Sequence, residues 1–163
     1  MADLARSVHG VQVRKARAGD LAAITLLVNG YAARDVMLPR TPEQIALALD
    51  SYVVATDARG TLLACAALRE YSPSLVELVS VAVSCDAHGM GLGRVVVEAA
   101  ERLAVQRGFT SVFAHSVTPR FFEAIGYTVV ERGLFPEKQA RPQTACIWRT
   151  LPAPARVSLA AAA

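Results

Sequence analysis

The feature that most constrains this chain is a run of alternating glycines between an apolar segment and an amphipathic one. Residues 76–83 are rich in β-branched side chains, which is typical of a buried central strand. The residues after the glycines repeat apolar side chains at helical spacing, which predicts a helix over Gly91–Arg107. Gly89, Gly91 and Gly93 therefore leave main-chain amides bare at a helix N-terminus, an arrangement that favours an anion, typically a phosphate.

Other glycine-rich loops fit this segment less well. A plain turn is the simplest alternative, but a glycine inside regular structure costs about 0.5–1 kcal/mol, so three of them are hard to explain as a mere connection. The Walker pattern is absent, and the dinucleotide fingerprint needs GxGxxG inside a βαβ unit. Here the spacing is GxGxG, and the two preceding strands are predicted to be linked as hairpins. Arg94 adds a positive charge at the mouth of the loop.

The segment from His88 to Gly93 resembles the acetyl-coenzyme A loop of the GNAT N-acetyltransferase superfamily. The family pattern is Arg or Gln, two residues, Gly, one residue, and Gly or Ala, and His88 stands at its first position. The resemblance implies that acetyl-coenzyme A is the co-substrate, with its pyrophosphate on the loop amides and its pantetheine arm along the central strand. The cofactor-binding residues that it implies are Val81, Ala82, Val83, His88, Gly89, Met90, Gly91, Leu92, Gly93, Arg94 and Phe122.

The composition describes a globular protein with a mild positive charge. The chain has 163 residues, of which 53% are hydrophobic and 19% charged, and its net charge of +3 is too small to indicate a nucleic-acid partner. No apolar run is long enough to predict a membrane span, and three cysteines without a CxxC pair predict neither disulfides nor a metal site. We expect a cytoplasmic protein with one domain over residues 1–151 and a Pro/Ala-rich tail over residues 152–163.

The order of predicted elements indicates an α/β (α+β) protein. It implies a mixed, mostly antiparallel sheet of about seven strands with helices on both faces, which matches the GNAT acyl-CoA N-acyltransferase fold. The helix after the glycines is expected to cross over between two parallel neighbouring strands. The predicted strands are 11–16, 52–56, 61–70, 76–83, 111–115, 127–131 and 144–151, and the predicted helices are 20–31, 42–49, 91–107 and 119–125.

One branch of the superfamily resembles this chain more closely, namely the acetyltransferase domain of N-acetylglutamate synthases. The similar segments include Leu38–Thr41, Leu63–Leu68 and Val76–Leu78, in the same order along the chain. This resemblance implies that Arg40 binds the carboxylate of an amino-acid acceptor; a solvated loop arginine is the alternative. The branch usually carries an Arg where this chain has Cys146, which leaves Arg149 as the predicted cation of the last strand.

Glu77 is the ionisable residue of the otherwise apolar central strand, which makes it the candidate general base. A structural ion pair is the alternative role for this carboxylate. Many GNAT enzymes supply a tyrosine to the leaving thiolate, but the matching residue here is Phe122. We therefore assign that role to Thr118, with Ser116 and Tyr127 as competitors. A main-chain N–H of the central strand is expected to stabilise the oxyanion by about 3 kcal/mol.

The remaining reactive side chains are interpreted more conservatively. Cys85 lies next to the glycine loop, but without a paired His and carboxylate in the sequence we do not expect a covalent acyl-enzyme. His88 and His115 are interpreted as hydrogen-bonding scaffold.

Three functions stay open at this stage. The favoured one is an N-acetyltransferase that acts on the amine of a small acceptor, an amino acid such as glutamate. The second is a GNAT enzyme for another small amine or a protein amine, and the third is a non-catalytic acyl-coenzyme A-binding domain. The resemblance also suggests a homodimer.

Overall fold

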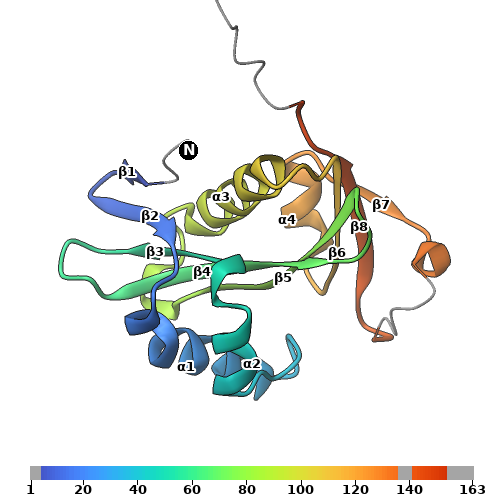
Figure 1. Ribbon diagram of the computed structural model, residues 1–163. Helices are drawn as coiled ribbons and strands as arrows, with labels where there is room; N and C mark the ends of the chain where they lie inside the picture. Colours follow the sequence, from blue (N-terminus) through green and yellow to red (C-terminus); the bar gives the residue numbers. More distant parts are fainter. Residues whose placement is uncertain (1–4, 136–140, 154–163) are drawn as a thin grey trace, which may run out of the picture.

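The computed structural model describes residues 5–135 and 141–153, and these form one mixed sheet with helices on both faces (Figure 1). Within the described residues the sheet has eight strands, in the order β1-β2-β3-β4-β5-β6-β8-β7. Their bounds are β1 (Arg6–Val8), β2 (Val11–Lys15), β3 (Tyr52–Thr56), β4 (Leu62–Glu70), β5 (Leu75–Val83), β6 (Ser111–Ser116), β7 (Thr128–Val130) and β8 (Ala145–Thr150).

Four α-helices of the described part of the chain flank this sheet. In Figure 1, α1 and α2 lie on one face, and α3 and α4 lie on the other. Their bounds are α1 (Leu21–Ala32), α2 (Pro42–Leu47), α3 (Leu92–Gln106) and α4 (Pro119–Ala124), with short 3-10 turns at Ala18–Asp20, Leu49–Ser51, Cys85–Ala87 and Arg132–Leu134. None of the described helices combines the length and the apolarity that a membrane span requires.

The predicted crossover is confirmed. Strands β5 and β6 pair in parallel and are joined by α3, whereas all the other paired strands of the sheet are antiparallel. The sheet has one strand more than predicted, because β1 forms a hairpin with β2 through His9 and Gly10, both at positive φ. A three-residue strand is too short to show a periodic pattern. Of the predicted tail, only Pro152 and Ala153 belong to the described residues.

The core has two main layers, one on each face of the sheet. On the α3 side, Val96 and Ala100 are fully buried against the strands. On the other side, Ile24 and Val28 of α1 pack against a layer that includes Val54. This double burial explains why the central strands are apolar on both faces.

Strand β5 contains a β-bulge at Ser80, whose backbone is left-handed with φ 54°. The register of β4 and β5 shifts here, because Ser80 and Val81 together lie opposite Ala66. An unbroken strand would place Glu77 and Val81 on the same face. The bulge instead leaves Glu77 on the α1–α2 side, opposite Arg69, while Val81 packs against the α3 layer.

Asp20 is the N-cap residue of α1, as predicted, but its side chain does not cap the helix and instead binds Arg14 and the main chain of Arg17. The Asp20 carboxylate is buried and accepts hydrogen bonds from Arg14 Nη1 at 2.7 Å, Arg14 Nη2 at 3.1 Å and Arg17 N at 2.7 Å. The hydrogen bond from the Arg14 guanidinium lowers the pKa of Asp20 below its ordinary value. The carboxylate thereby ties β2 to the start of α1.

Asp20→Asn is expected to lower the free energy of unfolding by about 2 kcal/mol at pH 7, because charge-assisted hydrogen bonds are lost. Since the pKa of Asp20 is depressed in the folded state, this stabilisation is present above about pH 4 and disappears as the pH falls through the folded-state value. Urea unfolding at pH 7 and pH 3 checks this, with Asp50→Asn as control because that side chain is 94% exposed. Equal losses for the two variants at pH 7 would contradict the assignment.

Candidate active site

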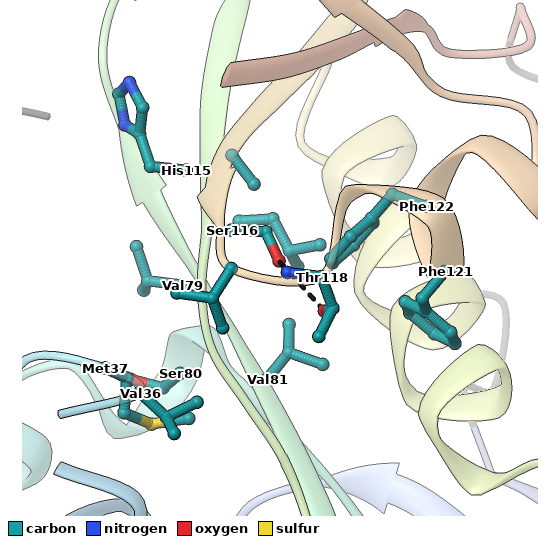
Figure 2. A pocket seen from close by; sticks show the side chains of 13 residues that line it. Val36, Met37, Val79, Ser80, Val81, His115, Ser116, Thr118, Phe121 and Phe122 are labelled. Atoms are coloured by element: carbon teal, nitrogen blue, oxygen red, sulfur yellow. Dashed lines mark hydrogen bonds between the residues drawn. The ribbon is translucent and has the colours of Figure 1, made fainter. Parts of the chain in front are cut away.

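Strands β5 and β6 separate at the centre of the sheet. Their parallel pairing covers only Leu75–Glu77 and Ser111–Phe113, and beyond these residues the two strands diverge. A cavity of about 120 Å³, the junction cavity, lies in this split. Figure 2 shows its lining, which β5, the end of β6 and the segment after it, α4 and the α1–α2 loop provide. Glu77 is the last paired residue before the split.

A larger cavity of about 550 Å³, the glycine cleft, opens between the end of β5 and the start of α3. It shares five residues of its lining with the junction cavity, so the two lie next to each other. The lining of the glycine cleft consists of Tyr31, Val36, Met37, Val81, Ala82, Val83, Ala87, His88, Gly89, Gly91, Leu92, Gly93, Arg94, Thr118 and Phe121.

The conformation of the glycine loop leaves main-chain N–H groups accessible to a ligand. Gly89 and Gly91 have φ of 80° and 73°, a region that L side chains rarely adopt, and Gly91 is the N-cap of the 15-residue helix α3. Gly93 is packed closely, because a Cβ atom there would lie 3.2 Å from Phe121 Cζ and the Phe121 ring would have to shift to admit it. The free amides and the positive end of the α3 dipole suit the pyrophosphate of coenzyme A.

Most residues predicted to bind the cofactor line this cleft, with three qualifications. Met90 is not part of the lining and is 55% exposed. Phe122 lines the junction cavity instead, whereas its neighbour Phe121 faces both cavities. Arg94 lines the mouth of the cleft but pairs with Glu98 at 2.7 Å, so its charge is partly neutralised.

His88 forms a hydrogen-bonded group with α1 that the sequence did not reveal. Its Nε2 lies 2.9 Å from the Tyr31 hydroxyl and 3.2 Å from the Val83 carbonyl oxygen, and the Tyr31 hydroxyl also donates to that oxygen. This arrangement agrees with the interpretation of His88 as scaffold, because the ring links the loop to the end of β5. Tyr31 could not have been identified, since 52 residues separate it from Val83.

A third cavity of about 280 Å³, the arginine cavity, lies on the α2 side of the sheet. Its lining consists of Arg40, Gln44, Ala48, Tyr52, Ala67, Leu68, Arg69 and Val79. Asn29 fixes the backbone of Arg40, because its Oδ1 accepts from Arg40 N at 3.0 Å and its Nδ2 donates to Arg40 O at 2.8 Å. Burial and the positive charge of Arg69 lower the pKa of the Arg40 guanidinium.

Glu77 lies beside this arginine cavity and not in solvent. The residue is 8% exposed, and its Oε2 is 4.0 Å from Arg69 Nε across the β4–β5 ladder. Both the base and the ion-pair interpretations of Glu77 therefore have a structural basis. Glu77 is itself not among the lining residues of the junction cavity or the arginine cavity, but Val79, two residues further along β5 on the same face, lines both.

Thr118 and its competitor Ser116 both line the junction cavity, and of these two hydroxyls only Thr118 also lines the glycine cleft. Thr118 precedes α4, and its Oγ1 lies 3.1 Å from Ser116 Oγ (Figure 2). Tyr127 is buried and donates its hydroxyl proton to Glu101 Oε1 at 2.8 Å. Burial and the Glu101 carboxylate raise the pKa of the Tyr127 hydroxyl, so this competitor has a structural role in the core.

Arg149 does not lie where its predicted role requires. It is opposite Val112 in the β6–β8 ladder, on the α3 face, where its Nη1 contacts Glu101 Oε1 at 3.4 Å and the Ile125 carbonyl oxygen at 3.1 Å. This is the opposite face from Glu77 and Arg40. Cys146, which stands where the synthase branch usually has an arginine, lies near Glu77, unlike Arg149. Burial and the charge of Glu77 raise the pKa of the Cys146 thiol to about 11. Cys146 thus lies on the acceptor side, but it carries no positive charge.

Two further reactive side chains, Cys85 and His115, lie near the cavities. Cys85 is an exposed free thiol with Arg34 Nη2 at 3.7 Å from its sulfur. His115 lines the junction cavity and its ring meets Phe113 edge to face, which fits a scaffold role. In residues 5–135 and 141–153, no cluster of three or more His, Cys, Asp or Glu side chains has metal-binding geometry.

The similarity of this chain to known proteins agrees with the fold and the cavities described above. The profile described as the Acetyltransferase (GNAT) family matches residues 27–127. An uncharacterized N-acetyltransferase of Chlorobaculum tepidum is 36% identical over 134 residues, which cover 82% of this chain and 86% of that protein. An amino-acid acetyltransferase of Pasteurella multocida is 27% identical over 133 residues, which cover 80% of this chain but only 30% of that protein.

The fold has a similar counterpart among solved structures. The structure of N-acetylglutamate synthase from Neisseria gonorrhoeae, complexed with coenzyme A and N-acetyl-glutamate, gives a TM-score of 0.82 at 23% identity. The match covers 90% of this chain and 36% of that one, so this chain spans about a third of the synthase. The family profile covers more than half of the chain, and the fold agrees with it. The chain therefore belongs to the GNAT acetyltransferase family and is an N-acetyltransferase.

Proposed function

We propose that this protein transfers the acetyl group of acetyl-coenzyme A to the amine of a small amino acid, glutamate or a related acidic one. The observation that carries this proposal is the row of three cavities. The glycine cleft lies next to the junction cavity, and the junction cavity shares Val79 with the arginine cavity. A thioester and an amino acid with an anionic group can therefore approach each other next to Glu77.

The glycine loop and β5 hold the donor in this proposal. Bound acetyl-coenzyme A supplies an activated thioester, so the reaction forms a C–N bond and breaks a C–S bond. The amides of Gly89, Gly91 and Gly93 face the pyrophosphate, while Val81 and Val83 offer main-chain groups to the pantetheine arm. A main-chain N–H after the bulge at Ser80 donates to the carbonyl oxygen as negative charge develops on it.

Glu77 and Arg40 act on the acceptor. Arg40 binds an acceptor carboxylate with its guanidinium, which has the geometry for two parallel hydrogen bonds. Glu77 removes a proton from the ammonium group, directly or through one water molecule, so that a neutral amine reaches the thioester carbon. The proton then resides on the Glu77 carboxylate until it is lost to solvent.

As the tetrahedral intermediate collapses, the nitrogen loses its second proton and the departing thiolate takes up one proton to leave as coenzyme A thiol. Thr118 donates a hydrogen bond to this thiolate. Ser116 Oγ accepts from Thr118 N at 3.0 Å, and the geometry allows Ser116 to donate its own proton to Thr118 Oγ1. The hydroxyl proton of Thr118 is then free for the sulfur. Its side chain makes no cap hydrogen bond to α4, so a substitution can be interpreted without a capping effect.

Thr118→Val is expected to lower kcat about ten-fold, because one hydrogen bond to a charged group is lost. The control is Tyr127→Phe, which removes a hydroxyl bound to Glu101 and is expected to lower stability while kcat of the folded enzyme is retained. Steady-state thiol release measures kcat, and urea unfolding measures stability. If kcat fell for Tyr127→Phe and not for Thr118→Val, the assignment would have to be reversed.

A thiol-release assay with acetyl-coenzyme A tests the proposal as a whole. The panel contains glutamate, aspartate, glutamine, neutral amino acids, polyamines and a peptide with a free N-terminus. The expected result is turnover with acidic amino acids. Turnover confined to polyamines or the peptide would overturn the acceptor assignment, and coenzyme binding without any turnover would overturn the catalytic one.

A cytoplasmic location belongs to the same proposal. It is supported by Cys85, an exposed free thiol, and by Cys65 and Cys146, which are buried and unpaired with each other. The homodimer stays a prediction.

A further inference from the structure

We infer that Arg69 is a specificity residue of the acceptor site, and that together with Arg40 it selects an amino acid that carries a second carboxylate. This inference rests on the proposed function and deepens it. It assigns a role to a residue of β4 that no sequence pattern singled out.

The first observation is the composition of the arginine cavity. Its lining brings two guanidinium groups, Arg40 and Arg69, together with the Tyr52 hydroxyl and the Gln44 amide. No carboxylate is among the described residues of this lining. Arg40 is close enough to Arg69 for the positive charge of Arg69 to lower its pKa. Two neighbouring cations in a half-buried cavity repel each other, and an anionic ligand between them relieves that repulsion.

The second observation is that the ion pair between Glu77 and Arg69 is weak. The two groups approach to 4.0 Å, which is an ion pair without a hydrogen bond. The Arg69 side chain is 42% exposed, whereas that of Glu77 is 10% exposed. Arg69 therefore keeps its N–H donors available on the open side of the cavity, where a ligand carboxylate can take two of them.

The third observation is the balance of charge around the site. Counting Arg40, Arg69 and Glu77, the acceptor site has a net charge of +1. An amino acid with one carboxylate and one ammonium adds no net charge, and a dicarboxylic one adds −1 and neutralises the site. The charge therefore favours a dicarboxylic acceptor over its neutral amide analogue.

Arg69 and Cys146 lie on the two sides of Glu77. Glu77 has Arg69 beside it across the β4–β5 ladder, and on the β6–β8 side it lies near Cys146, whose pKa it helps to raise. The related synthase branch carries an arginine at the Cys146 position, on that second side. In this chain β8 supplies no cation at that position, and the two positive groups of the arginine cavity are Arg40, before α2, and Arg69 of β4.

Arg69→Gln is the variant that tests this inference. Wild type and variant are compared by kcat/KM for glutamate and for glutamine, which differ only in the charge of the side-chain end. We expect the glutamate-to-glutamine ratio of kcat/KM to fall at least ten-fold, mainly through KM for glutamate. Any effect of Arg69 on the base Glu77 is common to both acceptors and cancels in the ratio.

Two further variants complete the design. Arg69→Lys keeps the charge but loses the fork-shaped donor, so it is expected to retain part of the selectivity. Arg59→Gln makes the same change of charge in the exposed β3–β4 turn and is expected to leave the ratio unchanged. Retained turnover of glutamine by Arg69→Gln shows that the variant is folded and binds the coenzyme.

The outcomes separate the inference from the proposed function. If wild type acetylates amino acids but the ratio is the same for wild type and Arg69→Gln, Arg69 has no role in selection and the inference is overturned, while acetyl transfer to amino acids stands. If wild type acetylates no amino acid, the proposed function itself is overturned, and the inference with it.

Discussion

Replacing Gly91 by valine is expected to weaken the binding of acetyl-coenzyme A at least 100-fold. Gly91 has φ 73° at the N-cap of α3, and a β-branched residue in this left-handed region is strained by about 1–2 kcal/mol. The loop escapes the strain by rotating its backbone, which turns amides away from the pyrophosphate. Each charge-assisted hydrogen bond lost adds about 1.5–3 kcal/mol. Isothermal titration calorimetry measures the affinity.

The control for Gly91→Val is Gly108→Val, which lies beyond the other end of the same helix. Gly108 has φ 87° and open space around it, so the backbone strain is matched. Both variants are expected to lose similar stability, but only Gly91→Val is expected to lose coenzyme affinity. An affinity for Gly91→Val within about three-fold of wild type would remove the glycine loop from the binding site.

Glu77→Gln is expected to lower kcat by about 10²- to 10⁴-fold, the range for loss of a general base. The amide keeps the size and the polar end of the side chain but cannot accept the ammonium proton. Glu77 does not line the glycine cleft, so the Kd for acetyl-coenzyme A is expected to stay within about two-fold. Single-turnover kinetics and calorimetry measure the two quantities separately.

Glu70→Gln is the matched control, because Glu70 lies on the same strand pair and is exposed to solvent. Its kcat is expected to equal that of wild type. If Glu77→Gln also turned over at the wild-type rate, the carboxylate would have a structural role, to which its ion pair with Arg69 contributes, and no catalytic one.

The parts of the site that were predictable from the sequence are those encoded over short distances. Gly89 and Gly91 indicate their own backbone conformation, and a strand, a glycine loop and a helix in succession imply a crossover between parallel strands. Glu77 could be recognised as one charge in an apolar strand. In each case the physical reason lies within a few residues of the chain.

The predictions that failed depended on which face of a strand or helix a side chain occupies. Arg149 is three residues from Cys146, and an odd separation along a strand places the two side chains on opposite faces of the sheet. The period of two was therefore sufficient to exclude Arg149 from the acceptor side. Phe121 and Phe122 differ in the same way on α4, where neighbouring residues point about 100° apart.

Arg69 and Tyr31 could not have been found from the sequence. The partnership of Arg69 with Glu77 depends on the β4–β5 register, and the bulge at Ser80 changes that register in the middle of the ladder. No local pattern marks a bulge formed by a serine with a left-handed backbone. Tyr31 looks like one more apolar-face residue of α1 until its hydroxyl reaches the end of β5.

The arginine cavity and the glycine cleft have no lining residue in common. In the proposed function, neither reactant therefore has to leave before the other enters, and both are held at the same time with their reactive ends toward the β5–β6 split. An enzyme built this way passes the acetyl group from one bound molecule to the other in a ternary complex. It has no need to store that group on a side chain of its own, which is why a free thiol such as Cys85 can lie beside the loop without taking part.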